Sequence, residues 1–66
     1  MFIQEILETI NNLEWKECTV ELISGIQMPK CTIQPQGQLL LITDGLGKKH
    51  LVFPDKIVRI FEYSII

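Results

Sequence analysis

The chain has 66 residues and a mass of 7.6 kDa, with 47% hydrophobic and 21% charged residues and a formal net charge of −2 at pH 7. This length permits one small domain, which buries only about 60% of the surface that its unfolded chain exposes. The abundance of Ile, Leu and Val excludes a disordered chain. Two cysteines and one histidine are too few for a disulfide scaffold or a metal site. We therefore expect self-association to supply the missing stability.

The sequence gives no sign of a membrane or secretory segment. No apolar run approaches the ~20 residues that span a bilayer. No basic residue precedes Lys16, and no small-residue cleavage site follows the first apolar residues, so the N-terminus does not resemble a secretory signal. We expect a cytoplasmic protein without a membrane partner.

The first segment has a helical period. Apolar side chains recur there at spacings of three and four residues and form one stripe, with glutamates and asparagines off it: Ile3, Ile6, Leu7, Ile10 and Leu13. Asn11 and Asn12 are poor helix formers and favour an end there. The pattern predicts an amphipathic helix over about residues 2–13, too short to be stable alone. Trp15 follows and is expected to pack this helix onto the rest of the domain.

From residue 17 onward the period is two, which is typical of strands. Alternation over Cys18–Leu22 predicts a first strand, Ser24-Gly25 a two-residue hairpin turn, and residues 26–33 a second strand in which Pro29 indicates an edge or a bulge. Residues 34–37, Gln-Pro-Gln-Gly, are expected to form a loop.

Three further strands are predicted. Residues 39–42 form a continuous apolar run, as expected of a strand buried on both faces, and residues 44–47 turn the chain. Residues 48–53 alternate again, Pro54-Asp55 makes a tight connection, and the last strand runs from Ile57 to about Ser64. One short helix and five short strands with tight turns predict a mainly β protein, a small antiparallel SH3-like barrel in a single domain that covers residues 1–66.

The last strand has two apolar faces. Its side chains alternate between Ile57, Phe61 and Tyr63 on one side and Val58 and Ile60 on the other. A small barrel has one interior, so the second face meets the helix, another subunit or water. We predict an oligomer interface at this end of the chain, made by Val52, Val58, Ile60, Phe61 and Tyr63. The alternative is that the N-terminal helix covers the second face.

Two segments resemble those of Sm-like proteins, and of bacterial Hfq in particular. Residues 20–26, Val-Glu-Leu-Ile-Ser-Gly-Ile, resemble the first Sm motif, in which a strand ends in an Asn-Gly turn. Residues 52–57, Val-Phe-Pro-Asp-Lys-Ile, are similar to the second Hfq motif, Val-Tyr-Lys-His-Ala-Ile, and Val52, Phe53 and Ile57 occupy its hydrophobic positions. The resemblance covers about residues 2–64.

The resemblance implies a closed homomeric ring of about five to seven subunits, in which the fourth strand of one subunit pairs with the fifth strand of the next. It also implies single-stranded RNA near the central pore. Pro54 and Asp55 replace the Lys-His pair with which Hfq reads uridine, so that chemistry does not carry over. Pro29-Lys30 stands where the family places a glycine at the bend of its second strand.

Three short segments supply the side chains that we expect to contact RNA. Amides at Gln36 and Gln38 can donate to and accept from base edges, and Phe53 offers a stacking surface with Lys56 beside it. The only basic cluster is expected to contact phosphates and consists of Lys48, Lys49 and His50. Because the sequence pI is near 5.2, stacking and hydrogen bonds should outweigh counterion release. The alternatives are a solvated loop tip for residues 48–50 and a core side chain for Phe53.

No arrangement of nucleophile, base and orienting group supports catalysis, so we expect no enzyme, no cofactor and no small-molecule substrate. An unbulged hairpin with a two-residue turn places Cys18 opposite Cys31, and a bulge at residues 29–30 would break that register. In a reducing compartment both cysteines are expected to act as small buried hydrophobes.

Two hypotheses of different class follow. The first is a non-catalytic Sm-like ring that binds single-stranded RNA. The second is an acidic SH3-like module, an adaptor or inhibitor, that binds protein and no nucleic acid. A change of Ile60 to Glu should break a ring and leave a monomeric adaptor intact, and changing Lys48 and Lys49 to Glu should matter only where phosphate is bound.

Overall fold

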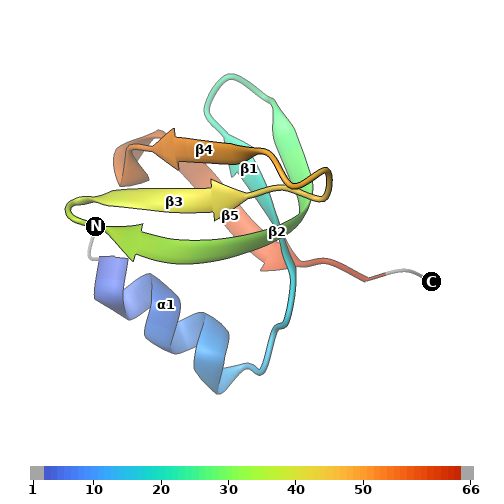
Figure 1. Cartoon of the computed structure of the whole chain (residues 1–66). Helices are drawn as coiled ribbons and strands as arrows, with labels where there is room; N and C mark the ends of the chain where they lie inside the picture. Colours follow the sequence, from blue (N-terminus) through green and yellow to red (C-terminus); the bar gives the residue numbers. More distant parts are fainter. Residues whose placement is uncertain (1–2, 65–66) are drawn as a thin grey trace.

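A computed structural model describes residues 3–64 as one helix over a five-stranded antiparallel sheet (Figure 1). The elements, in chain order, are α1 (Ile3–Asn12), β1 (Cys18–Leu22), β2 (Gln27–Gln36), β3 (Leu39–Thr43), β4 (Lys49–Val52), the single 3-10 turn η1 (Pro54–Lys56) and β5 (Ile57–Glu62). The mainly β class with a short N-terminal helix is therefore confirmed. The sheet order is β4-β3-β2-β1-β5, so β4 and β5 are its two edges and the sheet is not closed.

The helix ends where its sequence stops favouring it. α1 terminates at Asn12, and Glu14 follows with a φ of 59°. This left-handed conformation reverses the chain, as a glycine does at many helix ends, and lets the Trp15 N–H donate to the Ile10 carbonyl at 3.2 Å. The apolar stripe lies on the sheet without any fully buried residue, and Leu13 stays more than half exposed.

The β1–β2 hairpin differs from its predicted form. The Leu22 N–H donates to the Ile26 carbonyl at 2.9 Å, so the loop has three residues, Ile23 to Gly25, and not the two predicted. Gly25, with a φ of 92°, adopts a backbone conformation that the loop requires and that other residues rarely take. The register of this hairpin is Val20 with Met28 and Glu21 with Gln27.

A bulge at Pro29-Lys30 then shifts that register. Lys30 has a φ of 57°, and beyond the bulge Cys18 pairs with Cys31. The two cysteines are therefore opposite, although the sequence analysis expected this only for an unbulged hairpin and expected a bulge here to separate them. The three-residue loop and the bulge each shift the register by one residue in opposite senses, so the two shifts cancel at this pair.

β2 is longer than predicted, because it serves two partners in succession. Its first half pairs with β1, up to Cys31, and its second half pairs with β3, from Thr32 to Gln36. The predicted loop at residues 34–37 is thus wrong: Pro35 lies in the strand, opposite Leu40. A proline is tolerated there because this half of β2 has a hydrogen-bonded neighbour on one side only.

The core lies between the bent sheet and α1. Each of the five strands contributes at least one buried side chain to it, and Ile3 and Ile6 of α1 pack against this cluster: Val20, Cys31, Leu40, Ile42, Val52 and Ile57. β3 alternates between fully buried and half-buried positions, so it is less deeply buried than its apolar sequence predicts.

β5 does not present the two faces that simple alternation predicts. Its pairing with β1 shifts between Glu21 and Leu22, which pair with Arg59 and Ile57, so Val58 is bulged outward. Ile57 and Ile60 consequently both turn toward the core, where Ile57 is buried and Ile60 packs on the cluster. The predicted grouping of Ile57 with Phe61 is wrong for this reason.

Candidate functional site

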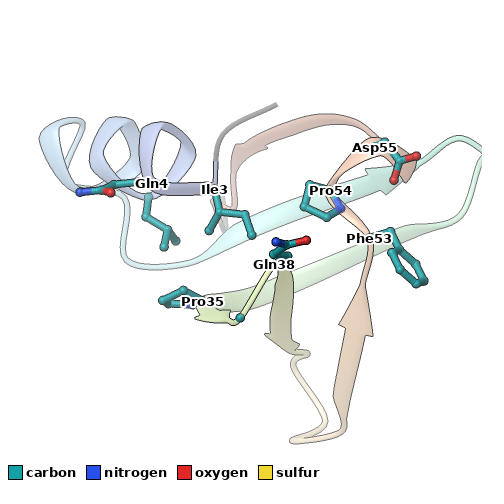
Figure 2. A pocket seen from close by; sticks show the side chains of 9 residues that line it. Ile3, Gln4, Pro35, Gln38, Phe53, Pro54 and Asp55 are labelled. Atoms are coloured by element: carbon teal, nitrogen blue, oxygen red, sulfur yellow. The ribbon is translucent and has the colours of Figure 1, made fainter.

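A wide cleft lies at one end of the sheet. It has a volume of about 980 Å³ and is formed by the start of α1, the β2–β3 turn and the segment between β4 and β5. Figure 2 shows its lining side chains, and two of the predicted RNA-contacting residues, Gln38 and Phe53, are among them.

Local backbone geometry brings these segments together. The β2–β3 turn consists of Gly37 and Gln38, and Gly37 has a φ of 62°. On the other side, Phe53 leaves β4 in an extended conformation, and Pro54 starts the turn of η1, as the fixed φ of proline favours. The Lys56 N–H closes this turn by donating to the Phe53 carbonyl at 3.0 Å.

The cleft combines an amide, an aromatic ring and a carboxylate. The Gln38 amide points into the space between Ile3 and Pro54, whereas the side chains of Phe53 and Asp55 are directed outward at its rim (Figure 2). Phe53 is 60% exposed, so it is a surface side chain and not part of the core. Such a ring is free to stack on a flat ligand.

Gln36 and Lys56 flank this cleft without lining it. Gln36 is the exposed last residue of β2, and Lys56 is the exposed last residue of η1. Four of the predicted contact residues therefore lie around one end of the sheet, which we call the cleft end: Gln36, Gln38, Phe53 and Lys56.

The other three predicted residues lie at the opposite end. Lys48, Lys49 and His50 belong to the β3–β4 turn and the start of β4, where Thr43 pairs with Lys49. Because β3 has five residues, roughly 14 Å of strand separates this turn from the cleft end. The predicted residues therefore form two separate groups.

The β3–β4 turn is organised by Asp44. One of its carboxylate oxygens accepts hydrogen bonds from the backbone N–H groups of Leu46 and Lys48, at 2.9 and 3.0 Å. The other accepts from His50 Nε2 at 2.8 Å. These bonds, led by the one from His50, lower the pKa of the Asp44 carboxyl below its ordinary value. His50 is thus engaged within the turn, while Lys48 and Lys49 are exposed.

The two edge strands are the second notable surface. Leu51 of β4 is 60% exposed, and it pairs with Leu41 on the face of the sheet that points away from the core. Val58 of β5 is 58% exposed at the bulge. Each edge thus combines backbone groups outside the sheet ladder with an exposed apolar side chain.

The outward face of β5 is preorganised by Arg59. Its Nε donates to a Glu21 carboxylate oxygen at 2.6 Å, and its guanidinium carbon lies 4.5 Å from the centre of the Phe61 ring. This cation–π contact and ion pair hold two long side chains flat against β1 and β5. Phe61 is half-buried as a result.

The predicted interface residues divide between surface and core. Val52 is buried and Ile60 packs on the core, so their side chains stabilise the monomer and are not free surface. Val58, Phe61 and Tyr63 retain exposed area. Leu51 is the exposed apolar residue on the β4 edge, and it was not among the predicted interface residues. The strict alternation of residues 48–53 was the signal that could have identified it.

Beside β5 runs a groove that sequence reasoning missed. It has a volume of about 370 Å³ between α1 and β5, with apolar side chains predominating: Ile6, Ile10, Trp15, Ile57, Val58 and Ile60. Trp15 is half-buried at this junction, as expected of a residue that packs the helix against the sheet.

Within residues 3–64 no three His, Cys, Asp or Glu side chains gather where they could hold a metal ion. The single described helix is too short and too polar to cross a membrane. Comparison of the chain with protein-family models, curated proteins and solved structures gives no match.

Proposed function

We propose that this protein assembles through the two edges of its sheet into a closed homomeric ring, and that the cleft end binds single-stranded RNA without catalysing a reaction. The observation that carries the proposal is the strand order, in which β4 and β5 are both left as open edges of one small sheet. Pairing of two different edges joins successive subunits head to tail. When the rotation from each subunit to the next leads back to the first subunit, this contact produces a closed ring.

The side chains on these edges suit such pairing. When β4 of one subunit extends the sheet beside β5 of the next, Leu51 comes to lie on the same face as Phe61 and the aliphatic part of Arg59. Burial of these groups offsets the marginal stability expected of a 66-residue chain. Pairing also removes the exposed backbone groups of both edges.

A feature of β2 supports the resemblance to Sm-like proteins. Lys30 has a φ of 57°, which is the conformation that glycine adopts most readily, at the position where the family places a glycine. The backbone bend is therefore present although the residue differs.

The RNA part of the proposal depends on the cleft end. An exposed aromatic ring, a neighbouring amide that both donates and accepts, and a nearby lysine provide stacking, base-edge hydrogen bonding and one phosphate contact. A ring repeats this set in every subunit, so weak single contacts combine into a multivalent one. The net charge of −2 per subunit limits the electrostatic share of binding.

The assembly is tested by light scattering after size exclusion, over a range of protein concentrations. We expect a mass of several times 7.6 kDa for the wild type. Val58→Lys and Leu51→Lys place charges on the two edges without touching the core and should shift the mass toward the monomer. Leu46→Lys is the matched control, because Leu46 is 94% exposed in the β3–β4 turn, away from either pairing surface. A monomeric wild type at all concentrations contradicts the ring.

A second function is favoured by a specific observation. The groove between α1 and β5 is apolar and adjoins an open edge, which is the arrangement that binds an extended peptide by strand addition. An SH3-like adaptor would use this groove. A monomer that shows no change in fluorescence anisotropy with labelled oligo(U), oligo(A), oligo(C) or oligo(G) would favour this second function over the first.

A further inference from the structure

Cys18 and Cys31 are directly opposite each other on neighbouring antiparallel strands, and neither is in a disulfide. Opposite residues of an antiparallel pair have Cα atoms about 4.5–5.5 Å apart. This is within the range that a disulfide bridges without backbone movement. The bulge at Lys30 produces the alignment, because without it the loop register would pair Cys18 with residue 30.

The two thiols also share a cavity. It has a volume of about 350 Å³ and is open to solvent, and it lies between α1, the segment after it and the bend of β2. Both cysteines, Trp15 and Lys16 line it. Leu7 and Ile10 of α1 form part of its wall, and no residue of α1 is fully buried. A small, uncharged oxidant therefore has space beside both cysteines.

We propose that Cys18 and Cys31 are a redox-modifiable pair, which a small peroxide oxidises to an intrachain disulfide that staples β1 to β2. This inference is independent of the proposed function. One thiol loses its proton and the thiolate attacks hydrogen peroxide. The O–O bond breaks, the sulfur becomes a sulfenic acid, and the departing hydroxide takes up the proton and leaves as water. The second thiol then attacks the sulfenic sulfur, the S–O bond breaks and a second water leaves. Two thiols thus lose two electrons and two protons, and one hydrogen peroxide is reduced to two waters.

The protein environment slows the reaction of both thiols with peroxide. Burial, with contributions from Asp44 and Cys18, raises the pKa of the Cys31 thiol to about 11. Burial and the Glu62 carboxylate raise the pKa of Cys18 as well. The thiolate fraction at neutral pH is therefore small, and the folded chain should react more slowly than ordinary exposed thiols. The position of Cys18 directly opposite Cys31 favours the second step, from sulfenic acid to disulfide, within one chain.

The experiment treats the reduced, full-length protein with hydrogen peroxide at pH 8 and follows its mass. We expect the loss of two hydrogen atoms from the monomeric chain, reversal by dithiothreitol, and a higher thermal unfolding midpoint of the oxidised form. Trypsin cleaves after Lys30, between the two cysteines, so an intrachain disulfide holds the two resulting peptides together until it is reduced.

Cys18→Ser and Cys31→Ser are the matched controls, and each should gain oxygen or remain unchanged instead of losing two hydrogens. The peptide mapping on the wild type does not depend on the folding of these variants. The proposal is overturned if the folded wild type gains oxygen atoms at each cysteine independently, if disulfides form only between chains, or if only the urea-unfolded chain forms the bond.

Discussion

Asp44 and His50 are joined across the β3–β4 turn by a hydrogen bond of 2.8 Å between His50 Nε2 and the carboxylate of Asp44. The same carboxylate accepts two backbone N–H groups that the turn leaves without a strand partner. One side chain thus satisfies three donors within seven residues of chain. The β3–β4 turn also packs on the bulge of β2. A Cβ added to Gly45 of this turn would lie 3.1 Å from the Cβ of Lys30.

Asp44→Ala is expected to destabilise the protein, because it leaves the Leu46 and Lys48 N–H groups and the His50 ring without their acceptor. The midpoint of chemical denaturation should fall, with an unchanged slope. Asp55→Ala, at an exposed aspartate of η1, is the matched control and should leave the midpoint nearly unchanged. Equal midpoints for the two variants would show that the Asp44 bonds contribute nothing.

The stabilisation by Asp44 should depend on pH in a defined direction. The His50 hydrogen bond and the two backbone N–H groups lower the pKa of Asp44 in the folded protein from its ordinary value of 3.8. The contribution is therefore fully present above that value and is lost as pH falls through the lower, folded-state pKa.

Asp44→Asn removes this titration while keeping the shape of the side chain. The difference in unfolding midpoint between wild type and Asp44→Asn should be constant above about pH 5 and shrink toward pH 2. Both proteins share the other carboxyl groups, so the effect of these groups on the unfolding midpoint cancels in the difference. A difference that grows on acidification would contradict the lowered pKa.

RNA binding should depend on one end of the sheet. Phe53→Ala is expected to weaken binding of a labelled single-stranded oligonucleotide about tenfold, since loss of one base–aromatic stack costs ~1–3 kcal/mol. Lys56→Glu should also weaken RNA binding. The Lys48→Glu, Lys49→Glu double variant should weaken it less than either of these changes, because those lysines lie at the far end of β3. Fluorescence anisotropy at fixed salt measures all three. A stronger effect of the double variant would place the RNA at the β3–β4 turn instead.

How far the sequence predicts this structure is well illustrated by the β1–β2 hairpin. Period-two alternation located both strands, and Gly25 located the turn. The sequence pattern could not reveal the loop length, because a three-residue loop and a two-residue loop both use a glycine with positive φ. Nor could it reveal the bulge at Lys30, since lysine gives no signal for a left-handed conformation.

The functional surfaces were predictable only in part. The resemblance to Sm-like proteins selected Phe53 and Gln38, and the structure brings them to one cleft. That Lys48 lies at the other end follows from strand pairing, which local sequence does not contain. The bulge at Val58 reversed the expected faces of β5, because one extra residue turns every later side chain over.

The contact between the β2 bulge and the β3–β4 turn gives a final prediction. Lys30→Gly should raise the free energy of unfolding by about 0.5–1 kcal/mol, because a left-handed conformation costs a residue with a Cβ ~1–2 kcal/mol and glycine recovers most of it. Gly45→Ala should destabilise the wild type, since the new Cβ would crowd the Cβ and Cδ of Lys30 at 3.1 and 3.4 Å.

The two changes should be coupled. In the Lys30→Gly background both crowding atoms are gone, and Gly45→Ala should become neutral or slightly stabilising through the lower entropy of the unfolded chain. Gly37→Ala is the control: its φ of 62° strains alanine in both backgrounds, and it has no neighbour within 4 Å to relieve. Denaturation midpoints of the four chains in the cycle, with the control in each background, measure the coupling. Additive effects of Lys30→Gly and Gly45→Ala would mean that the turn does not press on the bulge in solution.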